Sequence, residues 1–293
     1  MPIRAIGRLR TLFELVRLPN VFTAPADVAM GMAVAGAALT PATASLLLAS
    51  AFAYAGGMAL NDAWDAPVDF HERPERPIPW GRITRGGAFG FAGACLGVGL
   101  LLAARAGSGP FGVAVLLVVA IVLYDGFAKG SAMGPPVMAA CRLLNAGLGA
   151  AAGALTAITA LPLGLLFGYV LTLTVVSRFE VMTAPVALVR GAAGAFTALL
   201  LVSAGLLVTR GGGGGVTGVV FLAALAFWLG RPLRAALADP APRRIIGVIK
   251  AAVLGIILLD AAFVAAAGGP AAGLLVAALF VPAFLLGRRF ASA

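Results

Sequence analysis

The sequence predicts an all-α, polytopic membrane protein, and its composition carries that prediction. Hydrophobic residues make up 61% of the 293-residue chain and charged residues only 11%, with a mean hydropathy of +1.05. Soluble domains carry about a quarter charged residues. A chain that crosses a bilayer must satisfy its own backbone hydrogen bonds, and no alternating ten-residue pattern indicates a membrane barrel. We therefore expect one helical membrane domain over residues 1–293.

Apolar stretches separated by short polar segments predict the individual helices. A membrane span needs about 20 apolar residues. Ten stretches are candidates, of which the fourth is short: 21–39, 44–61, 87–104, 111–125, 136–156, 161–178, 191–209, 214–230, 245–266 and 271–287.

Basic residues predict the orientation of the bundle. With the N-terminus inside, only Arg105 and Arg210 of the 21 Lys and Arg residues fall in outer loops. Because positive loops stay in the cytoplasm, we expect a multi-pass protein of the cell (inner) membrane with a cytoplasmic N-terminus and cytoplasmic active-site loops. The net charge of +10 does not indicate a nucleic-acid partner, since the basic residues punctuate apolar spans.

Acidic residues gather at one place, the end of the second apolar stretch. Five of the 11 acidic residues lie within 62–75. Asp62, Asp65 and Asp69 follow the i, i+3, i+7 spacing that places them on one helical face. Three like charges on one face call for a cation, and oxygen ligands are what Mg²⁺ selects. Pro67 and the prolines at 74, 77 and 79 predict that the helix ends here and continues as an ordered loop.

Polar side chains elsewhere in the spans are candidates for the same site. Arg73 and Arg76 follow the aspartates, and carboxylates with arginines suit a metal-bridged polyphosphate. The remaining candidates have a structural alternative, an interhelical contact, an ion pair or a membrane-surface anchor: Asn20, Asp27, Lys129, Arg142, Asn145, Glu180 and Asp260. Cys95 and Cys141 have no metal-ligand spacing and are expected to be packing residues.

Two segments resemble the UbiA superfamily of intramembrane prenyltransferases. Arg-Leu-Pro-Asn at 17–20 is similar to the start of the family's first helix. Asn61-Asp62-x-x-Asp65-x-x-x-Asp69, followed by Arg73-Pro-x-Arg76-Pro, looks like its first Asp-rich motif. Tyr124 to Lys129 resembles its Tyr…Lys element more weakly. The resemblance implies nine helices, or ten with an extra one, around a central cavity open to lipid.

The resemblance also implies an activity, the Mg²⁺-dependent transfer of a prenyl group from a polyprenyl diphosphate to a lipid or aromatic acceptor. Asp62, Asp65 and Glu180 are then the expected catalytic residues. The expected Mg²⁺ ligands are Asn61, Asp62, Asp65, Asp69 and Glu180. The expected diphosphate-binding residues are Asn20, Arg73, Lys129, Arg142 and Asn145.

The second family motif is reduced. Where the family commonly has Asp-x-x-x-Asp after the sixth helix, this chain has Ser177-Arg178-Phe179-Glu180, with one acid. We therefore expect a divergent branch, similar to the UbiA-like protein of bacterial ebo gene clusters. The alternatives are a catalytically silent isoprenoid-lipid-binding protein and, with less support, a transporter. A CDP-alcohol phosphotransferase is excluded because its Asp-Gly-x-x-Ala-Arg element is missing.

Overall fold

The computed structural model describes residues 2–289, with side chains from Leu9 onward, and the described chain is helical without a β-strand. The first seven helices are α1 (Pro2–Leu15), α2 (Leu18–Val21), α3 (Thr23–Val34), α4 (Pro41–Glu72), α5 (Arg85–Ala106), α6 (Ser108–Leu123) and the π-helix η1 (Tyr124–Ala128). They are followed by α7 (Gly134–Ala150), α8 (Ala157–Ser177), α9 (Val186–Arg210), α10 (Gly212–Ala238), α11 (Pro242–Gly268), α12 (Pro270–Ala278) and α13 (Phe280–Arg289).

Each of the ten predicted apolar stretches is helical, which confirms the all-α membrane fold. Eight helical segments of the described chain are long and apolar enough to cross a membrane. The first and fifth stretches form shorter helices, α3 with 12 residues and α7 with 17. The tenth stretch is divided between α12 and α13, which meet at Leu279.

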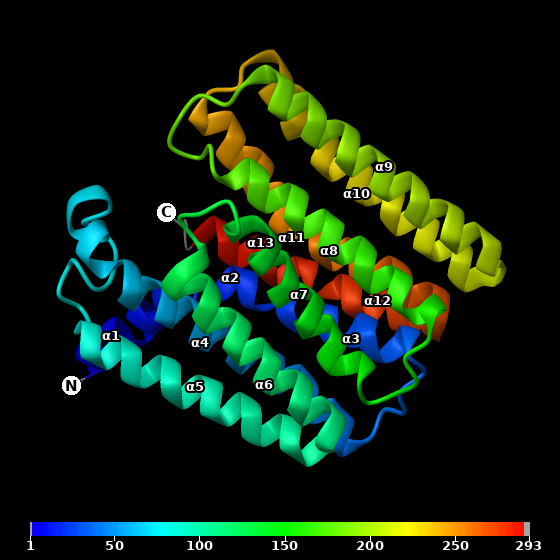
Figure 1. Cartoon of the computed structure of the whole chain (residues 1–293), viewed down its shortest axis with the longest axis horizontal. Helices are drawn as coiled ribbons and strands as arrows, with labels where there is room; N and C mark the ends of the chain where they lie inside the picture. The colour runs from blue at the N-terminus through cyan, green and yellow to red at the C-terminus, as the bar shows by residue number, and fades with distance from the viewer. Residues whose placement is uncertain (1, 290–293) are drawn as a thin grey trace.

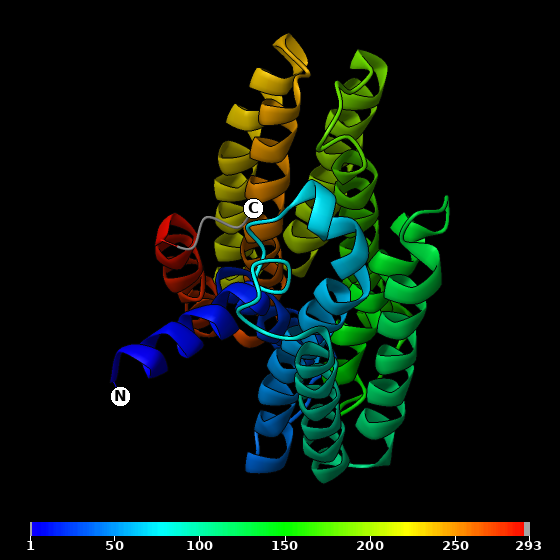
Figure 2. The same ribbon diagram turned by 90° about the vertical axis from the view of Figure 1, so that its left-hand side faces the viewer.

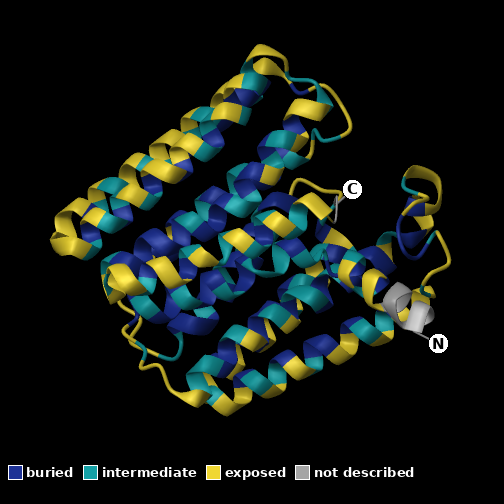
Figure 3. Ribbon diagram, turned by 180° about the vertical axis from the view of Figure 1, so that it is seen from behind, coloured by how far each residue is buried: buried dark blue, intermediate teal, exposed yellow. Residues whose placement is uncertain are grey.

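The helices form two groups around a shared centre. Figure 1 shows α5 and α6 at one edge and α9 and α10 at the other, with α3, α7 and α11 between them. In the most apolar 18-residue window of α11, 72% of residues are buried, against 22% in α9. Figure 3 shows the same contrast, since exposed residues follow the outer helices. α11 is therefore the centre of the core, and α9 presents an apolar face to lipid.

The N-terminal helix lies outside this bundle. Figure 2 shows α1 as an arm that projects from one end of the molecule, across the direction of the long helices. Near its end, Glu14 accepts hydrogen bonds from Arg10 and from Arg82 of the loop after α4. The contact with Arg82 therefore places the end of α1 beside the loop that follows α4.

Close packing of α3 against α7 depends on two glycines. A Cβ added at Gly31 would lie 1.9 Å from the carbonyl oxygen of Ala146, and one added at Gly149 would lie 2.1 Å from that of Val28. Small residues let membrane helices approach backbone to backbone. These glycines therefore set the distance between the two central helices that carry the polar residues described below.

The structure corrects one prediction, the end of the second helix. α4 continues past Pro67 to Glu72. A proline inside a helix leaves the carbonyl four residues earlier without its N–H partner, here Ala63. Nε of Arg85 donates to that oxygen at 2.8 Å, so the group that proline would orphan is satisfied from the neighbouring helix. The helix can therefore extend, and it keeps the whole acidic segment on one regular element.

Candidate active site

Two of the three aspartates of α4 converge on a single guanidinium. Nη1 of Arg76 donates to Oδ2 of Asp69 at 2.6 Å and to Oδ1 of Asp62 at 3.3 Å. Nη2 of Arg17 donates to the same oxygen of Asp62 at 3.3 Å. The three side chains Asp62, Asp69 and Arg76 are buried. The predicted helical face therefore holds for Asp62 and Asp69, and cations satisfy their charge.

The third aspartate turns toward the next helix. Asp65 forms an ion pair with Lys129, which follows the π-helix η1. In the same place, Nδ2 of Asn61 donates to Oδ1 of the buried Asp125 at 2.9 Å. The π-helix η1 is the element that brings Asp125 and Lys129 to α4. Such π-helical turns often occur at functional sites.

Arg17 has an unusual backbone. With φ of 49°, it is the one non-glycine residue of the described chain with a positive φ. A left-handed conformation costs a non-glycine residue roughly 1–2 kcal/mol. The fold keeps this conformation at the N-cap of α2, where the Arg17 side chain reaches Asp62 and Asn20 follows within the next turn.

Arg73 and Glu180 join the two halves of the bundle. Nη2 of Arg73 donates to Oε1 of Glu180 at 2.6 Å. Burial lowers the pKa of Arg73, but the contacts with Glu180, and less strongly with Asp69 and Glu72, outweigh burial and hold its pKa above the ordinary value. Arg73 is therefore a permanent cation at this position, and Glu180, the predicted metal ligand or base, forms an ion pair with it.

A buried polar cluster lies deeper, between α3 and α7. Nη2 of Arg142 donates to Oδ1 of Asp27 at 3.0 Å and to the carbonyl of Thr23 at 3.1 Å. Nδ2 of Asn145 donates to Oδ2 of Asp27 at 2.8 Å and to the carbonyl of Ala24 at 2.9 Å. Both amide hydrogens of Asn145 are thus engaged, which favours an interhelical role over the predicted phosphate contact.

Asp260 is buried beside Asp27, the acid of this polar cluster. Neither of its carboxylate oxygens has a hydrogen-bond partner within the part of the chain that the structure describes. It does not line the cavity described next. Its position therefore favours a polar contact with the Asp27 cluster over a place in the cavity wall.

A large cavity of about 1150 Å³ opens beside these groups. Of the predicted site residues, Asn20, Asn61, Arg73, Lys129, Arg142 and Glu180 line it, whereas Asn145 and the three aspartates of α4 do not. Much of its remaining wall is apolar, with Met138, Leu173, Phe227, Trp228 and Phe284, and further cations line it on α10, α11 and α13. A cationic end and apolar walls suit an amphiphile with an anionic head.

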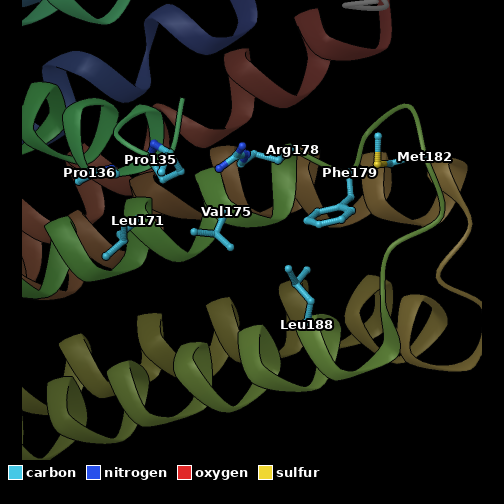
Figure 4. A pocket seen from close by; sticks show the side chains of 9 residues that line it. Pro135, Pro136, Leu171, Val175, Arg178, Phe179, Met182 and Leu188 are labelled. Carbon is cyan, nitrogen blue, oxygen red and sulfur yellow. The ribbon is translucent and has the colours of Figure 1, made fainter. Parts of the chain in front are cut away.

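A smaller cavity of about 510 Å³ adjoins the large one. Pro135 and Arg178 line both cavities. Figure 4 shows Leu171, Val175 and Leu188 around the smaller one, with Arg178 near Pro135. Its position between α7, α8 and the start of α9 gives the large cavity an apolar side branch toward the outer helices.

The side-chain oxygens of Asn61, Asp62, Asp65 and Asp69 are of the chemical type that binds a hard divalent cation. In the described chain, no group of three His, Cys, Asp or Glu side chains is arranged to hold a metal ion. Asp62 and Asp69 nevertheless already share one positive charge at Nη1 of Arg76. Carboxylate oxygens are the ligands that Mg²⁺ prefers, so these groups could hold it if the arginine moved to another anion.

Several residues of the site are absent from the sequence-based set. Arg17 and Asp125 contact the predicted ligands directly. Arg17 lies within a motif named above and Asp125 is the acid beside Tyr124, so proximity to a motif is the available signal. Arg231, Lys250 and Arg288 also line the cavity, and only the fold brings them there.

Comparison with known proteins agrees with this geometry. The UbiA prenyltransferase family model matches residues 22–239. A digeranylgeranylglyceryl phosphate synthase from Methanopyrus kandleri is 35% identical over 146 residues, which cover 48% of this chain and 54% of that protein. The matched segment thus spans about half of that relative.

Solved structures share the fold. A UbiA homolog from Archaeoglobus fulgidus bound to DMAPP and Mg²⁺ aligns with a TM-score of 0.64 at 16% identity, over 92% of this chain and 99% of that one. A structure of digeranylgeranylglyceryl phosphate synthase aligns with a TM-score of 0.62 at 20% identity, over 89% and 98%. The expectation of an ebo-type branch stays a prediction. The chain is a multi-pass membrane protein that belongs to the UbiA prenyltransferase family.

Proposed function

We propose that this protein transfers a prenyl group from a polyprenyl diphosphate to an acceptor hydroxyl within the membrane, in the presence of Mg²⁺. The observation that carries the proposal is the cavity itself, where Arg17, Arg73, Arg76 and Lys129 stand at one end of an apolar chamber. The diphosphate would lie among these cations and the prenyl tail along the apolar walls. We keep the predicted cytoplasmic orientation of this end as part of the proposal.

The residues at the head of the cavity have separate roles in this proposal. Asn61, Asp62, Asp65 and Asp69 would hold Mg²⁺, which supplies positive charge to the leaving diphosphate. Arg17, Arg76 and Lys129 would turn from the aspartates to the phosphate oxygens, which frees the carboxylates. Asn20, Arg73 and Arg142 line the same end and would contact the diphosphate.

The reaction breaks the bond between the first prenyl carbon and the diphosphate oxygen, which keeps the electron pair. The acceptor oxygen then bonds to that carbon, and its proton passes to the released diphosphate. Positive charge on the allylic carbon is short-lived in water, and the apolar walls exclude water from it. Cations fixed at the leaving group stabilise its growing charge without reorganisation.

A glyceryl phosphate bearing one prenyl chain is our proposed acceptor. The curated relative is named for a product with two geranylgeranyl groups on glyceryl phosphate. Such a product requires an acceptor that already carries one chain and still has a free hydroxyl. An acceptor of this kind is itself an amphiphile, and the cavity of about 1150 Å³ exceeds the roughly 300–1,000 Å³ typical of a single ligand pocket.

The test uses purified protein in neutral nanodiscs with radiolabelled geranylgeranyl diphosphate, Mg²⁺ and a prenylglyceryl phosphate. We expect diphosphate release and a labelled diether lipid, both abolished in Asp62→Ala and Asp65→Ala. Asp239→Ala is the matched control, because Asp239 follows α10 and does not line the cavity. Binding of the diphosphate without turnover, with any acceptor, would instead show an isoprenoid-binding protein.

A further inference from the structure

The cations that line the cavity fall into two sets. Five of them, Arg17, Arg73, Arg76, Lys129 and Arg142, each form an ion pair with an aspartate or glutamate. Four others line the same cavity and have no ion pair with a carboxylate among the described residues: Arg178, which follows α8, and a second set formed by Arg231, Lys250 and Arg288. The paired set lies on the loops and helices around α4, and the unpaired set lies on α10, α11 and α13.

Aromatic contacts bring the unpaired set together. Nε1 of Trp228 donates to the carbonyl of Ala251 at 2.9 Å, next to Lys250 on α11. The Trp228 ring contacts Phe284 edge to face, with centroids 5.8 Å apart. Arg231 lies one turn after Trp228 on α10, and Arg288 lies one turn after Phe284 on α13. The three cations therefore extend from helices that meet at one aromatic cluster on the cavity wall.

Lys250 presents a charge to the cavity from within a membrane span. Its side chain is exposed, and it lies eight residues inside α11, about 12 Å from the start of that helix at 1.5 Å per residue. An ionised side chain within a membrane span is expensive unless it faces water or a counter-ion. The three aspartates of α4 are already paired with other cations, so they do not serve Lys250.

We propose that Arg231, Lys250 and Arg288 form a second anion subsite, which binds the phosphate-ester head of a second amphiphile. The inference rests on the proposed function and deepens it, because it places the head of the acceptor apart from the diphosphate of the donor. The same chemistry occurs in the head of an anionic phospholipid, so acceptor and resident lipid are two sources of one ligand class. In either case, the apolar chain lies along Trp228 and Phe284.

The test measures binding and needs no turnover. The probe is a hexadecyl ether of glycerol phosphate, compared with the same ether of glycerol, in phosphatidylcholine nanodiscs without donor or Mg²⁺. Loss of one charged hydrogen bond costs about tenfold or more in affinity. We expect the wild-type protein to bind the phosphate form about tenfold tighter than the alcohol, and Arg231→Gln and Lys250→Gln to lose that preference.

Controls separate charge from folding. Arg234→Gln removes a cation one turn further along α10 that does not line the cavity, and it keeps the preference. Arg231→Lys keeps the charge and most of the preference. If Arg231→Gln and Lys250→Gln bind the phosphate form as tightly as wild type, the subsite does not exist.

Two further arms identify the source of the ligand and the dependence on function. If phosphatidylglycerol in the nanodisc displaces the phosphate probe, the subsite also binds the head of a resident lipid. If it does not displace the probe, the subsite is specific for the acceptor. Both results require the subsite. One outcome is that no prenyl transfer occurs, while wild type prefers the phosphate form and the variants lose that preference. In that case the proposed function fails and the subsite stands. If transfer occurs while Arg231→Gln and Lys250→Gln bind as wild type, only the subsite fails.

Discussion

Arg73 and Glu180, 107 residues apart in the chain, are joined by a hydrogen bond of 2.6 Å. The contact connects the end of α4, which carries the first Asp-rich motif, to the turn after α8, where the second motif is reduced to one acid. The one remaining acid is therefore paired with a cation. This ion pair indicates that Glu180 acts by holding Arg73 at the cavity.

This relationship predicts the effect of Glu180→Gln. The side chains of Arg73 and Glu180 are 28% and 40% exposed, so solvent screens their attraction. We expect the KM for the prenyl diphosphate to rise roughly three- to tenfold, with kcat within about twofold of wild type. Arg73→Gln should show the same KM effect, and the double variant should be no worse than Arg73→Gln alone. A fall of about a hundredfold in kcat at constant KM would instead assign Glu180 the predicted role of base or metal ligand.

The contact between Arg85 and Ala63 predicts a stability effect with a rescue. Arg85→Ala leaves the Ala63 carbonyl without its donor, and a buried unsatisfied group costs about 1–3 kcal/mol. Pro67→Ala in the same chain restores the N–H that the helix lacks and should recover most of the loss. Thermal unfolding in detergent measures both variants. A double variant as unstable as Arg85→Ala alone would show that this hydrogen bond does not compensate for Pro67.

Two buried aspartates predict opposite outcomes for the same substitution. Asp27→Asn weakens a buried ion pair with Arg142, and breaking such pairs costs about 3–5 kcal/mol. Asp260→Asn removes the repulsion between two neighbouring buried carboxyls and leaves the pair of Asp27 with Arg142 in place, so stability should be unchanged or higher. The comparison is made by thermal melting of both variants in one detergent. Equal destabilisation would mean that Asp260 has a partner in the membrane.

Close approach of α3 and α7 predicts intolerance at Gly149. A Cβ there would lie 2.1 Å from the Val28 carbonyl, and the helices would have to separate. We expect Gly149→Ala to lower the yield of monodisperse protein in size-exclusion chromatography severalfold. Gly164→Ala on α8 is the control, because no atom lies within 4 Å of its added Cβ. A normal profile for Gly149→Ala would show that α3 and α7 can repack.

Local sequence patterns are sufficient to predict the helices and the shared face of Asp62 and Asp69. Apolar length located the ten stretches, and the spacing of Asp62 and Asp69 placed both at Arg76. Pro67 was misjudged because its compensation comes from Arg85, 18 residues away in sequence. Arg231, Lys250 and Arg288 could not be assigned to the cavity, since helices distant in sequence bring them together. The hydrogen bonds of Asn145 to α3 could not be predicted either, because they depend on the close packing around Gly31 and Gly149.

The most direct test of the central claim is a calorimetric titration of the purified protein with a non-hydrolysable geranylgeranyl diphosphate analogue, with and without Mg²⁺. If the α4 carboxylates hold a cation that bridges to the diphosphate, Mg²⁺ should tighten binding about tenfold or more in wild type and not in the Asp62→Asn/Asp69→Asn variant. Equal strengthening by Mg²⁺ in both proteins would contradict the claim.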